Sequence, residues 1–159
     1  MWIIFIGLVA VICYLSFVNG EEAKAQGADL IYKLAQKYYG VNDIPDEVML
    51  SFTYKFRQIG RILIFIMLGI IGTLTIHLTF YNWWWIIRTA ISVIMLVLIA
   101  TFTEEYKNYL PTRHFSKEEM LISIMGVLLG FIFITVVTAV YGFIKGVSNI
   151  FIGKNGDIR

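Results

Sequence analysis

The chain has 159 residues, of which 58% are hydrophobic and 15% charged. A soluble domain carries about 25% charged residues because its surface must face water, so this composition indicates a membrane protein. The net charge of +2, without a basic run, argues against nucleic-acid binding. Cys13 is the single cysteine, which excludes an intramolecular disulfide, and no Cys or His spacing predicts a metal site. We expect neither a metal nor another cofactor.

Hydrophobic residues are concentrated in four segments, at 2–18, 62–80, 83–102 and 121–144. An α-helix needs about 20 apolar residues to cross the hydrocarbon core, and it satisfies its own backbone hydrogen bonds there. The sequence therefore predicts an all-α membrane protein, a single domain over 1–159 with four transmembrane helices in a bundle.

The first segment is slightly short, and its alternative interpretation is a secretory signal peptide. No Lys or Arg precedes it, and a cleavage site would fall late, behind Glu21 and Glu22. These features favour a retained helix.

Residues 19–60 predict an amphipathic helical loop outside the membrane, between the first two spans. Residues 26–39 are expected to form one helix with an apolar face, ended by Gly40. A second helix is expected after Pro45, because acids follow in its first turn, and to continue into the span 62–80. We expect this loop to lie on the membrane surface or to cap the bundle.

Residues 80–85 are almost all aromatic and predict a tight turn at headgroup depth between the second and third spans. Arg88 lies one turn further along the helix and can extend its guanidinium back to that surface. His77, near the same turn, is expected to be interfacial rather than catalytic.

Charged residues are concentrated from Glu104 to Glu119, between the third and fourth spans. In a helix, Glu119 and Ser123 lie on the same stripe as Gly126 and Gly130. The Gly126-x-x-x-Gly130 spacing lets another helix approach closely. Packing within the bundle is favoured over a dimer contact.

This charge density predicts a mixed-charge site at one mouth of the bundle. The side chains expected there are Arg57, Arg61, Glu104, Arg113, Glu119 and Ser123. The planar guanidinium of arginine suits a carboxylate or a phosphate, so an anionic group is the expected ligand. One alternative is a set of interfacial charges that pair with one another and with water, in a purely structural protein. Another is a membrane enzyme in which Glu104 and Glu119 perform acid–base chemistry on a lipid-linked substrate, although the sequence has no nucleophile–base pair and no phosphate loop.

The segment 104–130 resembles the signature region of the VanZ-like membrane proteins. It matches their pattern, in register and without a gap, at Glu104, Pro111, Arg113, Phe115, Gly126 and Gly130. It departs from the pattern at Lys107, Ser116, Glu119 and Ser123, where the family has Gln, Asp, Asp and Asn. The segment 57–69 is similar to the start of the family's second helix, with Arg61 at the position of the family's usual His.

The resemblance implies a small multi-span protein of the bacterial cell envelope, in a family of which some members are linked to resistance to glycopeptide antibiotics such as teicoplanin. The mixed-charge site itself predicts membrane lipids or a lipid-linked cell-wall precursor as partners. The implied topology has both termini in the cytoplasm and the charged loops outside.

The count of Lys and Arg, nine on the loop side against four on the terminal side, favours the opposite orientation. Glu21 and Glu22, directly after the first span, suit a translocated loop.

Overall fold

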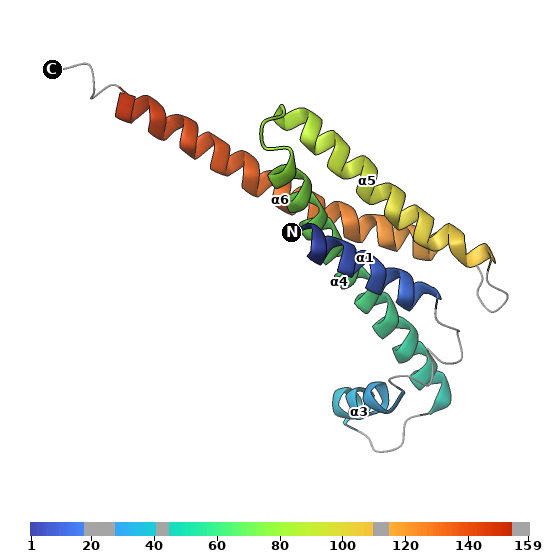
Figure 1. Ribbon diagram of the computed structural model, residues 1–159. Helices are drawn as coiled ribbons and strands as arrows, with labels where there is room; N and C mark the ends of the chain where they lie inside the picture. Colours follow the sequence, from blue (N-terminus) through green and yellow to red (C-terminus); the bar gives the residue numbers. More distant parts are fainter. Residues whose placement is uncertain (18–27, 41–44, 110–114, 154–159) are drawn as a thin grey trace.

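The computed structural model describes residues 1–17, 28–40, 45–109 and 115–153, and throughout these ranges the regular structure is helical (Figure 1). The elements are α1 (Trp2–Phe17), α3 (Ala28–Tyr39), α4 (Asp46–Thr79), α5 (Trp85–Glu105), the short 3-10 helix η1 (Tyr106–Tyr109) and α6 (Lys117–Gly153).

Three of these helices, α4, α5 and α6, are long and apolar enough to cross a membrane. The predicted spans 62–80, 83–102 and 121–144 fall on them, and the all-helical class and membrane character predicted from composition are confirmed to this extent. The 16 residues of α1 make a helix about 24 Å long, which is shorter than a hydrocarbon core of about 30 Å.

The segment before the second span is organised by local signals. Gly40 adopts a positive φ of 67° and its N–H donates to the carbonyl of Gln36 at 2.8 Å, a helix end that suits glycine. α4 begins after Pro45 and continues without a break for 34 residues. α3 packs on the first part of α4 through aromatic rings, with Tyr38 and Tyr39 centred 5.9 Å and 6.0 Å from Phe52.

α4 and α6 run in the same direction and touch through glycines. A Cβ added at Gly130 would overlap the carbonyl oxygen of Ile66 and lie 3.1 Å from the Cα of Gly69. A Cβ added at Gly126 would lie 3.0 Å from the carbonyl oxygen of Ile62. The backbones approach this closely because neither helix has a side chain at the crossing point.

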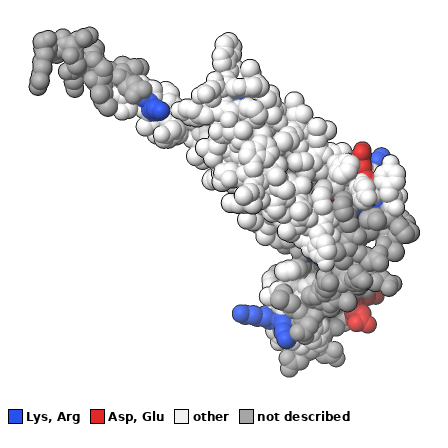
Figure 2. All heavy atoms as spheres, in the orientation of Figure 1, with Lys and Arg blue, Asp and Glu red and all other residues white. Residues whose placement is uncertain are grey.

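The core lies between these two helices, α5 and α1. Its buried side chains are Phe5 and Ile12 from α1, Phe65 and Leu68 from α4, Leu96 and Ala100 from α5, and Val127 from α6. Large apolar side chains cover the outside of the bundle, and on the face seen in Figure 2 the charged residues are confined to its ends. Such a surface suits lipid as its solvent rather than water.

The bundle therefore has two different ends. The charged end is where α5 gives way to η1 and α6 begins, and the aromatic end is the turn at residues 80–84 between α4 and α5. The first part of α4, with α3, projects beyond the charged end, and the last part of α6 projects beyond the aromatic end (Figure 1).

Candidate functional site

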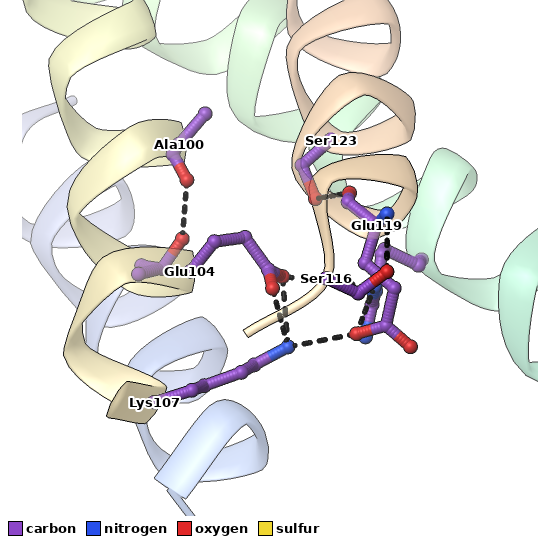
Figure 3. A network of polar contacts seen from close by, with 8 residues as sticks. Ala100, Glu104, Lys107, Ser116, Glu119 and Ser123 are labelled. Carbon is purple, nitrogen blue, oxygen red and sulfur yellow. Dashed lines mark hydrogen bonds and ion pairs between the residues drawn. The ribbon is translucent and has the colours of Figure 1, made fainter. Parts of the chain in front are cut away.

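Four charged side chains from four elements meet at the charged end and form what we call the ion cluster: Arg61 of α4, Glu104 of α5, Lys107 of η1 and Glu119 of α6. Lys107 Nζ donates to Glu104 Oε1 at 2.8 Å and Oε2 at 2.7 Å, and to Glu119 Oε2 at 3.1 Å (Figure 3). Arg61 Nη1 lies 2.7 Å from Glu119 Oε2 and 3.6 Å from Glu104 Oε1.

Local structure brings each member to this point. Glu104 is in the last turn of α5, and the 3-10 turn that follows directs Lys107, three residues later, back over it. Glu119 lies in the first turn of α6, where the helix dipole favours a carboxylate. The Ser116 hydroxyl accepts a long hydrogen bond from the Glu119 N–H at 3.4 Å, in the manner of an N-terminal helix cap.

The solvent exposure of the side chains increases from one side of the ion cluster to the other. Glu104 and Lys107 are each 1% exposed, whereas Arg61 is 20% and Glu119 28% exposed. Two cations face two carboxylates, so the charges balance within the cluster. Pairing of this kind offsets the large cost of removing each charge from water.

Ser123 lies one turn after Glu119 and is fully buried, but it is not a further cluster ligand. Its hydroxyl donates to the carbonyl oxygen of Glu119 at 3.0 Å. Thr103, on α5, donates in the same way to the carbonyl of Ala100 at 2.9 Å. These bonds satisfy the buried hydroxyls within their own helices.

The structure thus brings together Arg61, Glu104 and Glu119, with Ser123 beside them. Arg57, one turn earlier on α4, is exposed, and the described ion pairs of Glu104 and Glu119 do not include it. Arg113, expected at the same mouth, lies outside the described residues. Lys107 is the member that the sequence interpretation missed, although its spacing from Glu104 at the end of an apolar span is a usable signal.

This geometry limits the chemistry available. Both oxygens of Glu104 accept from Lys107, and the side chain is too buried to touch a substrate in this arrangement. Arg61 approaches the carboxylates through Nη1, and its guanidinium has more N–H donors than that contact needs. Within the part of the chain that the structure describes, no group of three or more His, Cys, Asp or Glu side chains could hold a metal ion.

The aromatic end is built differently. Trp2 Nε1 donates to Thr79 Oγ1 at 2.8 Å, which ties the first turn of α1 to the last turn of α4. Arg88 Nη1 donates to the carbonyl of His77 at 3.3 Å, and its Cζ lies 6.0 Å from the centre of the Tyr81 ring. His77 itself is buried, in the last turn of α4.

Comparisons with protein families, with curated proteins and with solved structures find no match to this chain.

Proposed function

We propose that this protein is a VanZ-like integral membrane protein of the bacterial cell envelope in which the exposed side of the ion cluster binds an anionic group. The ligand is the phosphate of a lipid headgroup or of a lipid-linked cell-wall precursor. The observation that carries the proposal is the placement of four charges at the end of three apolar helices, with a partly exposed guanidinium at the edge. Ionisable groups in membrane helices are costly and mark functional sites.

Binding proceeds by exchange of one anion for another. Glu119 is the most exposed member of the cluster, and both of its described cationic contacts go to one oxygen, Oε2. A phosphate takes the place of this carboxylate on Arg61, because a guanidinium binds phosphate through paired hydrogen bonds. Lys107 and Glu104 stay behind as a neutral buried pair.

In this proposal α1 is the fourth membrane helix, and α3 with the start of α4 forms an amphipathic arm on the membrane surface. Support for a retained α1 comes from Phe5 and Ile12 in the core and from the bond of Trp2 to Thr79. Local thinning of the bilayer accommodates its short length. Both termini are cytoplasmic and the charged end is outside, as the family resemblance implies.

The described residues that carry the resemblance occupy positions that support a VanZ-like role. Glu104 is at the centre of the ion cluster, and Gly126 and Gly130 are at the contact of α4 with α6. A contribution to glycopeptide resistance follows from binding of the cell-wall precursor. It is tested by expressing the wild-type protein and Arg61→Gln in a susceptible strain and measuring the inhibitory concentration of teicoplanin, which only the wild type is expected to raise.

A purely structural role for the cluster is the second candidate. It is favoured by the three hydrogen bonds of Lys107, all of which end on carboxylates of the same chain. An enzyme acting through Glu104 and Glu119 has less support, because Glu104 is enclosed by its own partners.

The test is binding of a polyprenyl phosphate, with the corresponding polyprenol as reference, to purified protein followed by native mass spectrometry. Arg61→Gln should weaken binding of the phosphate by about tenfold or more, equivalent to about 1.4 kcal/mol, and Lys55→Gln, at an exposed position of the same helix, should not. Equal binding by wild type and Arg61→Gln, with only a lower melting temperature for the variant, would leave the structural role. A product peak that disappears in Glu119→Gln would identify an enzyme.

A further inference from the structure

Arg88 is a cation without a counter-ion among the described residues. It lies in the first turns of α5, near the aromatic end, and the structure gives it no ion pair with any described carboxylate. Its polar contact is the long hydrogen bond to the carbonyl of His77, and its Nε is buried with no hydrogen-bond partner. A partly buried cation at the end of a membrane helix is stabilised by a counter-charge, and here the described residues do not supply one.

Among the described residues, four buried side-chain atoms have no hydrogen-bond partner: Arg61 Nη1 lies at the charged end, and the other three, which include Arg88 Nε, lie in the opposite half of the bundle. His77 is 6% exposed and its Nε2 has no partner, and Thr135 Oγ1 on α6 is also buried without one. α6 passes Gly69 of α4 at Gly130, so Thr135 lies further toward the aromatic end. Buried polar atoms are almost always hydrogen-bonded, and of these atoms the Nε of Arg88 and the Nε2 of His77 belong to residues in direct contact. This pair leaves donors for a partner from outside the described chain.

The start of α5 adds favourable electrostatics for an anion. Trp84 precedes the helix and makes no side-chain capping hydrogen bond, so the first amide N–H groups of α5 lack that partner. Amide N–H groups and the dipole of a helix N-terminus favour a phosphate there. Arg88 is on the same turn and adds a full positive charge.

The surroundings place this region at the depth of lipid headgroups. Tyr81, Trp83 and Trp84 are large and exposed around the turn, as in the aromatic belts of membrane proteins. The Arg88 guanidinium packs over the Tyr81 ring, which holds it near that surface while its stem extends into the bundle.

We propose that the aromatic end binds the phosphate of an anionic membrane phospholipid, which pairs with Arg88 at the start of α5 and accepts a hydrogen bond from His77. The acyl chains lie along the apolar outer face of the bundle. This site is separate from the ion cluster and does not depend on the function proposed for it.

Native mass spectrometry of the detergent-purified full chain tests this site, with phosphatidylglycerol, diacylglycerol and inorganic phosphate as probes. We expect wild-type protein to retain phosphatidylglycerol and to lose diacylglycerol. Arg88→Gln should weaken phosphatidylglycerol binding by about tenfold, the loss of roughly one charge-assisted contact, and His77→Gln should weaken it less. Lys145→Gln is the matched control, because Lys145 is an exposed cation on the part of α6 near the same end.

The variants also separate this site from the ion cluster. If Arg61→Gln no longer binds phosphatidylglycerol while Arg88→Gln binds it as wild type does, the proposal for the aromatic end is overturned. The function proposed for the ion cluster would then still stand. Equal losses in Arg88→Gln and Lys145→Gln would also overturn it, because they would indicate general charge attraction. Inorganic phosphate that binds as tightly as phosphatidylglycerol would overturn the lipid assignment. If Arg88→Gln does not fold, Arg88→Lys keeps the charge without the planar fork, and unchanged binding by Arg88→Lys and His77→Gln together would count against the site.

Discussion

The two ends of the bundle handle buried charge in opposite ways. At the charged end, two cations and two carboxylates from α4, α5, η1 and α6 form ion pairs with one another. At the aromatic end, a single arginine faces no described acid, and polar atoms of α4, α5 and α6 stay unpaired. A dense cluster of charges can bind a ligand only where one of its members is exposed and keeps free donors, as Arg61 does at the edge of the ion cluster. A sparse region with unsatisfied donors has more capacity for a ligand.

The largest effect should come from breaking the ion cluster at its centre. Lys107→Met leaves the buried Glu104 with only the more distant Arg61 as a cation, and removal of one partner from a buried pair costs about 3–5 kcal/mol. The variant should therefore unfold at a much lower temperature in detergent, as measured by circular dichroism. Lys117→Met, at an exposed position of the first turn of α6, should change the melting temperature little. A Lys107→Met protein as stable as the control would show that the cluster carries little stability.

Lipid binding at the aromatic end should raise the thermal stability of the protein, and this gain should depend on Arg88. Phosphatidylglycerol at about 100 times its dissociation constant should stabilise wild-type protein by about 2.7 kcal/mol, and Arg88→Gln should lose most of this gain. The measurement is thermal unfolding with and without lipid. The same gain in both proteins would place the lipid elsewhere and remove the contrast between the two ends.

The glycine contact between the ends should be sensitive to a single methyl group. Gly130→Ala places a Cβ against the backbone of Ile66 and Gly69, and overpacking of this kind costs about 1–3 kcal/mol. Gly142→Ala is the matched control on the same helix, because nothing lies within 4 Å of its added Cβ. Equal stability of the two variants in detergent would refute the close packing of α4 on α6.

The smallest effect should come from the hydrogen bond between Trp2 and Thr79 at the aromatic end. Trp2→Phe keeps an aromatic ring but removes the hydrogen bond to Thr79, which contributes about 0.5–1.5 kcal/mol. Trp84→Phe, at a strongly exposed position, is the reference. A loss for Trp2→Phe as large as that of Lys107→Met would mean that the attachment of α1 stabilises the bundle as much as the ion cluster does.

The three long helices of the fold follow from local rules, and the sequence is sufficient to predict them. Long apolar runs form helices because the backbone must satisfy its own hydrogen bonds in lipid. Gly40 ends α3 and Pro45 precedes α4 for reasons of backbone conformation alone. The spacing of Gly126 and Gly130 shows that one face of α6 admits a close neighbour, but not that the neighbour is α4 at Gly69.

The partners in the candidate site depend on more than the sequence. Helix direction and length place Arg61, Glu104 and Glu119 at the same end, so their proximity is predictable from the chain. The spacing of Lys107 from Glu104 indicates that the two side chains can pair, but not that Lys107 is buried against Glu119, because this depends on the 3-10 turn after α5 and on the position of α6. Arg57 and Arg61 share a face of α4, yet Arg57 is left outside because α4 projects beyond the end of the bundle. The sequence by itself therefore determines the helices and their charged and aromatic ends. Only tertiary packing decides which charges are paired and which stay free, because pairing depends on contacts between segments far apart in the chain.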